Sequence, residues 1–390
     1  MPLIIVDLQR QGMAPDAARI WLGSVVSLGM LAYAVGKIPG GAMADALGGR
    51  TNFLGGMAGS ILATLCFVMA GTMPIFTIAW MANRFFQSLG WTGAVQTVSK
   101  WFPFRSHGAV MGILSLSYLF GDVIVRQVLS VLIARGFSWQ QLFYSSAAVL
   151  GTIFLICLAL LRESPVAIGE PEAAVNPTNL FQEASPKGIA FLLSFFKSRA
   201  FCLVCGISLG TTILRETFNF WVPTYFTQVV HMTPAQAAQN SGIFPLFGGI
   251  SVILCGWLSD RMGVIGRAAI IFGGMLLSVG ALLSLGTISP GNQLISVALV
   301  GLVAFLIVGP YSFLAGAISL DFGGKKGSGT ASGLIDTVGY IGGMLSGDTI
   351  ARISAGYGWS GTFVALAGVA LFTAVTAAFF LREQRRARLI

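Results

Sequence analysis

The chain has 390 residues, of which 55% are hydrophobic and only 9% are charged, and its mean hydropathy is +0.82. About a quarter of the residues of a soluble domain are charged, so this composition excludes a water-soluble globule. The net charge of +9 does not indicate nucleic-acid binding, because no basic segment is interleaved with aromatic residues. The 5 cysteines lie in apolar runs and only 2 histidines are present, so we predict no metal, no cofactor and no enzymatic chemistry.

Eleven apolar runs are long enough to cross a bilayer as helices, for which about 20 residues suffice. In chain order they cover residues 20–44, 52–71, 74–98, 107–134, 140–161, 200–228, 240–258, 268–288, 293–320, 328–355 and 360–381. The runs are apolar all round and do not alternate as barrel strands do. We therefore predict an all-α membrane protein.

The lysines and arginines gather in alternate loops and at the C-terminal end of the chain. Because cationic loops stay on the cytoplasmic side, these loops and the C-terminus are predicted to be cytoplasmic. We expect a monomeric, multi-pass protein of a bacterial cytoplasmic membrane, with the lipid bilayer as its surroundings.

Two acidic motifs recur half a chain apart. GGAMADALGGR begins at Gly40 and CGWLSDRMG begins at Cys255, and the glycines and aspartates of the two motifs are each 215 residues apart. A second block, GFSWQQLF, recurs as GYGWSGTF at an offset of 220. These repeats predict two homologous bundles, residues 1–161 and 200–390, joined by a cytoplasmic linker over residues 162–199.

Several motifs resemble those of one transporter family. GGAMADALGGR resembles the signature loop of the major facilitator superfamily, and RFFQSLG is similar to its fourth-helix motif. ETFNFWVPTYF and FLIVGPYSF are similar to blocks of the organophosphate:phosphate antiporters and the wider anion–cation symporter group. The resemblance implies the major facilitator fold, with a small organic anion, a phosphorylated metabolite, exchanged for inorganic phosphate by alternating access. Two alternatives stay open: a proton- or sodium-coupled symporter of organic anions or sugar acids, and a non-transporting membrane sensor.

The opening stretch MPLIIVDLQRQGMAP resembles the end of the family's first helix. We therefore expect most of that helix to be missing, which leaves a partial first helix and five spans in the first bundle and six spans in the second. In the resembled antiporters a first-helix arginine pairs with the seventh-helix arginine on the phosphate, and its position would precede this chain.

Charged residues inside apolar runs are costly and tend to be functional. The resemblance implies that Arg215 binds the substrate phosphate, a role that suits the planar donor fork of a guanidinium. The alternative is an ion pair with an acid such as Asp336. The resemblance also implies that Lys37 borders the pocket and that Tyr118 stands where some relatives place a substrate-contacting histidine. Their alternatives are a snorkelling lysine and a packed tyrosine.

Further candidates lie in the same apolar runs. Asp122 and Arg126 are four residues apart on one helix face, which predicts a salt bridge. Residues assigned to coupling or to intramembrane ion pairs are Asp122, Arg126, Arg84, Glu216 and Asp336, with Asp348 added in the symport alternative. Trp221 and Tyr340 are candidates to line the cavity, with packing in the core as the alternative.

The two acidic motifs are predicted to be gating loops, formed by Gly41, Asp45 and Arg50 and by Gly256, Asp260 and Arg261. Each aspartate is expected to accept hydrogen bonds from a neighbouring helix N-terminus or to pair with a cytoplasmic arginine. Such contacts would hold each half in one state and release it in the other. The alternative is that the motifs are simple tight turns.

Overall fold

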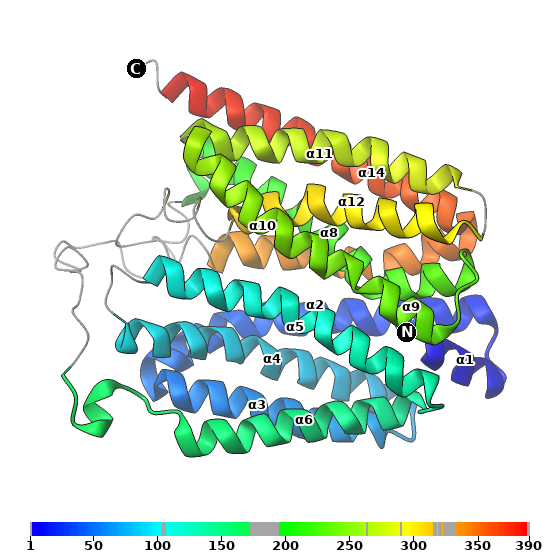
Figure 1. Cartoon of the computed structure of the whole chain (residues 1–390), viewed down its shortest axis with the longest axis horizontal. Helices are drawn as coiled ribbons and strands as arrows, with labels where there is room; N and C mark the ends of the chain where they lie inside the picture. Colours follow the sequence, from blue (N-terminus) through cyan, green and yellow to red (C-terminus); the bar gives the residue numbers. More distant parts are fainter. Residues whose placement is uncertain are drawn as a thin grey trace. The chain divides into compact units, whose positions relative to one another are not determined.

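Helices make up the regular structure of the protein. The structure, a computed structural model, describes residues 2–102, 107–171, 195–262, 264–288, 291–314, 318, 322 and 333–387 (Figure 1). Throughout these residues the regular elements are helical, so the all-α prediction is confirmed.

The first part of the chain forms α1 (Pro2–Arg10), α2 (Pro15–Leu47), α3 (Gly49–Val68), α4 (Met73–Trp101), α5 (His107–Ala134) and α6 (Trp139–Leu160), followed by the short 3-10 helix η2 (Pro165–Ile168). The second part forms α8 (Arg199–Gln228), α9 (Pro234–Ser241), α10 (Ile243–Met262), α11 (Val264–Thr287), α12 (Gln293–Ser312), a helix over residues 333–343, η4 (Met344–Ser346) and α14 (Asp348–Ala387). Most of the predicted linker, residues 172–194, lies outside the described residues.

Within the described residues, nine helical stretches are long and apolar enough to cross a membrane. The last of them, Gly333–Arg386, contains two of the predicted runs, which are separated at Gly358, where a φ of 68° breaks the helix. Helix α4, at 29 residues, is long enough but is not among the nine, because its polar residues lower its apolar character. Within the described residues each predicted run nevertheless lies on helical segments, and the run 328–355 is divided among the helix over residues 333–343, η4 and the start of α14.

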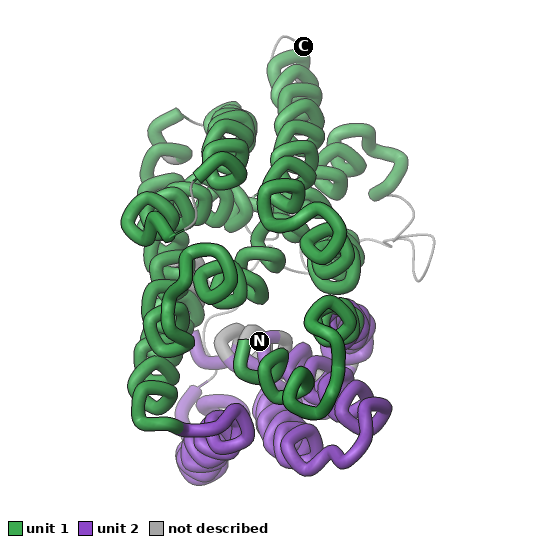
Figure 2. Tube along the Cα trace, turned by 90° about the vertical axis from the view of Figure 1, so that its right-hand side faces the viewer, with its two compact units in different colours: residues 1–24, 118–136, 183–390 green, residues 25–117, 137–182 purple. Residues whose placement is uncertain are grey.

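The chain forms two compact units, coloured separately in Figure 2. Unit 1 comprises Met1–Ser24, Tyr118–Gly136 and Glu183–Ile390, and unit 2 comprises Val25–Ser117 and Phe137–Gln182. The N-terminal pieces of unit 1 bond to its C-terminal helices: the Ser24 hydroxyl donates to Asp348 at 2.6 Å, and the Ser130 hydroxyl donates to the Ala235 carbonyl at 2.8 Å. The predicted division into homologous halves rests on the sequence repeat and stays a prediction.

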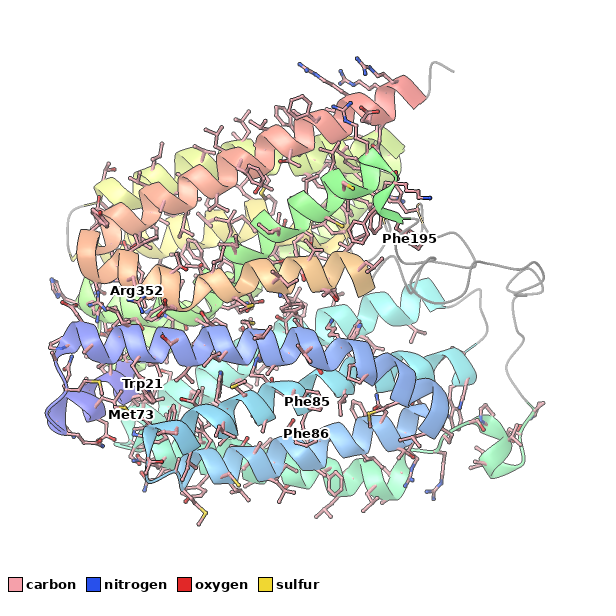
Figure 3. All side chains as sticks on the ribbon, turned by 180° about the vertical axis from the view of Figure 1, so that it is seen from behind. Trp21, Met73, Phe85, Phe86, Phe195 and Arg352 are labelled. Carbon is pink, nitrogen blue, oxygen red and sulfur yellow. The ribbon has the colours of Figure 1, made fainter. Side chains whose placement is uncertain are left out.

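In unit 2, small residues let α3 and α4 approach closely. A Cβ added at Gly93 would lie 2.6 Å from the backbone nitrogen of Phe53, and one added at Gly49 would lie 2.7 Å from the Gly93 carbonyl oxygen. Phe86, which projects from α4 beside Phe85 (Figure 3), fills the space that a side chain at Gly59 would need. Lipid removes the hydrophobic driving force between membrane helices, so close van der Waals packing of this kind is one of the forces that hold them together.

In unit 1, α8 is the most enclosed of the described spans, with 78% of its apolar window buried. Its large side chains Phe201, Trp221 and Phe226 are completely or almost completely buried. This burial encloses two ionisable residues, Arg215 and Glu216, in the middle of the helix. A charged pair in such surroundings is expensive and therefore marks the helix as a candidate site.

Candidate functional site

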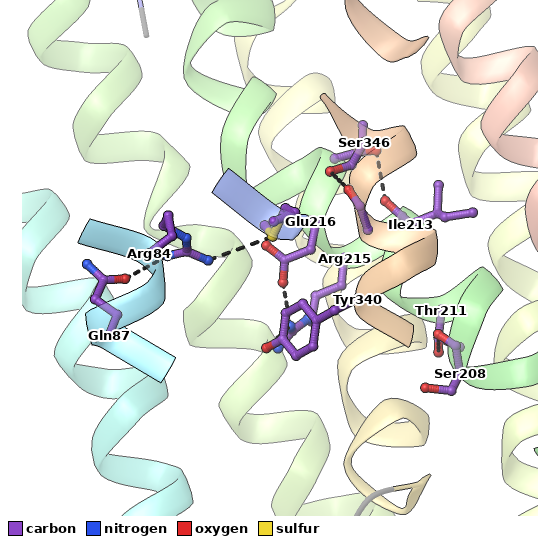
Figure 4. A network of polar contacts seen from close by, with 12 residues as sticks. Arg84, Gln87, Ser208, Thr211, Ile213, Arg215, Glu216, Tyr340 and Ser346 are labelled. Carbon is purple, nitrogen blue, oxygen red and sulfur yellow. Dashed lines mark hydrogen bonds and ion pairs between the residues drawn. The ribbon is translucent and has the colours of Figure 1, made fainter. Parts of the chain in front are cut away.

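The centre of the candidate site is the guanidinium of Arg215, near the middle of the 30-residue α8. Arg215 and Glu216 are only 7% and 5% exposed, and they form an ion pair through Arg215 Nη2 (Figure 4). The same Nη2 donates to the Tyr340 hydroxyl at 3.3 Å. The guanidinium also stacks on the ring of Tyr311, with 4.3 Å between its carbon and the ring centroid.

One donor of the Arg215 guanidinium has no partner. Its Nε atom is buried and makes no hydrogen bond with the described residues. A buried donor left unpaired costs roughly 1–3 kcal/mol, and native structures satisfy nearly all such groups. The guanidinium therefore keeps capacity for a further acceptor, such as an anion oxygen, beside its contact with Glu216.

From the sequence we predicted that Arg215 binds the substrate phosphate or, alternatively, that it forms an ion pair with an acid such as Asp336. In the structure the acid in contact with Arg215 is Glu216, and Asp336 lies within electrostatic range of Tyr311. Sequence reasoning missed Tyr311 altogether. Its signal is a tyrosine placed directly after Pro310 in an otherwise apolar helix, where its ring provides a face for the cation.

The aromatic candidates occupy different surroundings. Tyr340 bonds to Arg215, whereas Trp221 is 1% exposed and donates its indole N–H to the Ser346 carbonyl at 2.7 Å. A cavity beside Trp221 is lined by Thr217 and otherwise by apolar and aromatic residues such as Trp359, and Arg215 does not line it. Tyr118 is 55% exposed, yet it lies close enough to Arg215 for an electrostatic interaction.

Asp122 and Arg126 form an ion pair on α5 at 3.0 Å. Arg126 also donates from Nη1 to the Ser241 hydroxyl at 3.0 Å. Ser241 is the last residue of α9, so the pair is tied to a second helix of unit 1. Both charges are thereby compensated by protein groups, as is usual for charges in membranes.

Unit 2 holds a separate cationic cluster around Tyr33 on α2. The Arg84 guanidinium lies 4.9 Å from the Tyr33 ring centroid, and the Lys37 ammonium lies 5.4 Å from it. Arg84 donates to Gln87 at 2.8 Å, and its Nε is buried without a partner in the described part of the chain. Both cations thus lie within cation–π distance of the same aromatic ring.

The acidic motifs are helical, which corrects the prediction that they are loops, and their role in gating stays a prediction. Gly41 and Asp45 lie in the last turns of α2, and Gly256 and Asp260 lie in the last turns of α10. The helices continue because the first motif supplies alanine, methionine and leucine and the second supplies leucine and methionine, and α2 stops only at Gly48, where φ is 91°. The side chains of both aspartates lie outside the described residues, so their predicted hydrogen bonds stay predictions.

The motif arginines are described. Arg50 lies in the first turn of α3 and donates from Nε to the Leu161 carbonyl at 2.7 Å and from Nη2 to the Leu158 carbonyl at 2.9 Å. It thus caps the C-terminal end of α6. Arg261 is exposed and stacks on Trp257, with 3.9 Å between its guanidinium carbon and the ring centroid.

Sequence reasoning missed Glu163, the acid that accepts hydrogen bonds from the N-terminus of α3. Glu163 accepts hydrogen bonds from the backbone N–H groups of Gly49 at 3.0 Å and Arg50 at 2.8 Å, and its carboxylate pairs with Lys100 at 2.5 Å. Burial acts to raise the pKa of Glu163, but the hydrogen bonds from Lys100 and the two backbone N–H groups outweigh it and lower the pKa below its ordinary value. Glu163, rather than a motif aspartate, is the acceptor that the described residues place at this helix end.

Known proteins resemble the chain over nearly its whole length. The model of the Major Facilitator Superfamily matches residues 1–347. A glycerol-3-phosphate transporter of Bacillus subtilis (strain 168) is 27% identical over 97% of this chain and 87% of its own. A probable hexose phosphate transport protein of Chlamydia muridarum is 24% identical over 98% and 85%, and the human sugar phosphate exchanger 3 is 24% identical over 89% and 77%.

Solved structures agree in fold. A D-xylose-proton symporter superposes with a TM-score of 0.72 at 16% identity, covering 97% of this chain and 90% of that one. A bacterial homologue of the human lysosomal transporter Spinster superposes with a TM-score of 0.73 at 13% identity, over 94% and 89%. The helices and the matches define an integral, multi-pass membrane transporter. The chain belongs to the Major Facilitator Superfamily, and its curated relatives are consistent with the organophosphate:phosphate antiporter group.

Proposed function

We propose that the protein exchanges a small organic anion, a phosphorylated metabolite, for inorganic phosphate by alternating access. The observation that carries this proposal is the Arg215 guanidinium, enclosed in α8 with one donor unpartnered. Relatives whose names specify glycerol 3-phosphate and sugar phosphates support the choice of solute class. The protein would act in a bacterial cytoplasmic membrane with its C-terminus in the cytoplasm.

In this proposal Arg215 binds the phosphate group directly, and Tyr340 and Tyr311 orient it. Tyr340 holds one edge of the guanidinium by its hydroxyl, and Tyr311 covers one face of it. The fork geometry of arginine then presents its remaining donors to phosphate oxygens. Lys37 is proposed as a further solute contact because the family resemblance implies a lysine at the border of the pocket.

The test is a counterflow screen in proteoliposomes. Vesicles that contain the purified protein are loaded with phosphate, and uptake of labelled phosphate is measured while glycerol phosphate, phosphorylated sugars or phosphonates compete outside. We expect internal phosphate to stimulate uptake and at least one phosphorylated compound to inhibit it. Uptake that is indifferent to internal phosphate and to every competitor would contradict the proposal.

The contact between Glu216 and Arg215 favours a second candidate, a proton- or sodium-coupled symporter of organic anions. A carboxylate that shares the guanidinium with an anion can exchange a cation with solvent when the anion binds. Uptake driven by a pH or sodium gradient, without stimulation by internal phosphate, would identify this second function. Stimulation by internal phosphate with no response to either gradient would identify exchange.

A further inference from the structure

Glu216 directly follows Arg215 on α8, and this neighbourhood is unusual for an ion pair. Successive residues on a helix do not face each other, so both stems must bend for the charged ends to meet. The Glu216 stem passes over helix 333–343, where a Cβ added at Gly343 would lie 3.6 Å from Glu216 Cγ. The contact therefore depends on side-chain rotamers and can open without movement of the backbone.

The other described side chains that lie against the Arg215 guanidinium are tyrosines, and Asp336 interacts electrostatically with one of them, Tyr311. Tyr311 comes from α12, Tyr340 from helix 333–343 and Tyr118 from α5. Among the described side chains in contact with the guanidinium, Glu216 is the acidic one. It compensates the buried charge of Arg215 when no solute is bound.

We infer that Glu216 is an internal counterion that lets the solute-free carrier reorient, so that the protein supports net flux of its anion as well as exchange. This inference rests on the proposed function, in which Arg215 binds the transported anion. A carrier whose binding cation is unpaired must carry that charge through a closed, water-poor state. Such a carrier moves efficiently only when an anion is bound, and it is restricted to exchange.

With Glu216 in contact, the charge of Arg215 is compensated in the empty site. When an anion arrives, the carboxylate yields its place by rotation of its stem, and the unpartnered Nε offers the anion a first donor. If the insertion penalty for an unpaired arginine at the centre of a membrane helix is added to the barrier, reorientation of the carrier slows on the order of 100-fold. We expect reorientation of the solute-free carrier to slow by that factor when the Glu216 charge is removed.

Two flux measurements distinguish reorientation of the empty carrier from reorientation of the loaded carrier: net efflux requires both, whereas exchange requires only the loaded carrier to reorient. Proteoliposomes are loaded with labelled inorganic phosphate and diluted either into phosphate or into a medium without transportable anions. The wild-type protein is expected to release phosphate into both media, with net efflux within roughly tenfold of exchange. Glu216→Gln should keep exchange and lose net efflux by on the order of 100-fold. Glu216→Asp, which keeps the charge, should retain both fluxes.

Asp16→Asn, which removes an exposed carboxylate at the start of α2, is the matched control and should retain both fluxes. Net efflux by Glu216→Gln at the wild-type rate would overturn the inference. If neither Glu216 variant folds, the wild type still decides: exchange without net efflux overturns the inference and leaves the proposed function standing. A wild type with no exchange of phosphate or any tested phosphorylated compound overturns both.

Discussion

Replacing Glu163 with glutamine tests the contacts at the N-terminus of α3. The two N–H groups at Gly49 and Arg50 have no acceptor within the helix, and the Glu163 carboxylate supplies one to each. Glutamine keeps one carbonyl oxygen but loses the negative charge and places an amide NH₂ where the second acceptor was. It also breaks the ion pair with Lys100.

The expected loss follows from burial. A hydrogen bond to a charged group contributes about 1.5–3 kcal/mol when solvent is excluded, and an exposed ion pair contributes about 0.2–1 kcal/mol. The side chains of Glu163 and Lys100 are 32% and 35% exposed, so water screens much of the interaction. We expect Glu163→Gln to reduce the local stability of the first turn of α3 by about 1 kcal/mol, which is roughly a fivefold change in an equilibrium constant.

Hydrogen–deuterium exchange of the peptide that begins α3 measures this directly. The amides of Gly49 and Arg50 should exchange roughly five times faster in Glu163→Gln than in the wild type. Glu170→Gln removes a carboxylate from the same segment and is the matched control, because Glu170 is exposed. Unchanged exchange in Glu163→Gln, or equal acceleration in both variants, would show that Glu163 does not stabilise the first turn of α3.

The same site predicts a dependence on pH. The pKa of Glu163 is lower in the folded protein than its ordinary value, because hydrogen bonds and Lys100 favour the charged form despite burial. Its contribution to the unfolding free energy is therefore fully present at neutral pH and is lost as the pH falls through the lowered pKa. Thermal unfolding in detergent should show a smaller acid-side loss for Glu163→Gln than for the wild type. An identical loss of stability at acid pH in the two proteins would show that Glu163 does not cause it.

Three further predictions concern packing and pairing, each read from thermal unfolding in detergent. Gly93→Ala should destabilise the protein by about 1–3 kcal/mol, because the new Cβ would meet backbone atoms of α3. Gly90→Ala, where a Cβ meets open space, should change the stability by no more than about 0.5 kcal/mol. Equal effects of the two substitutions would contradict the close contact between α3 and α4. Asn52→Ala should cost about 1–3 kcal/mol because two buried carbonyls lose their donor, and no loss would contradict those bonds. Arg126→Gln should destabilise more in the wild-type background than beside Asp122→Asn, and strict additivity would contradict the ion pair.

Composition, length and charge placement were sufficient for the membrane helices, because burial in lipid requires long apolar runs and leaves few other solutions. The acidic motifs illustrate the limit of that reasoning. Glycine and aspartate are common in turns, yet here α2 and α10 continue through most of each motif, to Leu47 and Met262. Local propensity over four or five residues did not reveal where the helix would stop.

The candidate site likewise contains residues that the sequence predicts and residues that it does not. Arg215 was recognisable from sequence because a charge in an apolar run is conspicuous. Its contact with Glu216 was not predicted, because adjacent helical residues ordinarily point apart. Tyr311 and Glu163 act across tertiary contacts, on a helix distant in sequence in one case and at another helix end in the other. Such partners depend on packing that no local pattern records.

In the proposed function the Arg215 guanidinium binds the transported anion. Exchange of labelled phosphate by phosphate-loaded proteoliposomes, compared among the wild type, Arg215→Lys and the control Arg352→Lys, tests it most directly. Lysine keeps the charge but lacks the donor fork, so we expect Arg215→Lys to lose roughly 100-fold or more of the exchange rate while unfolding at a temperature close to that of the wild type. Arg352, which is exposed on α14 (Figure 3), should tolerate the same change. Exchange by Arg215→Lys at the wild-type rate would contradict the account.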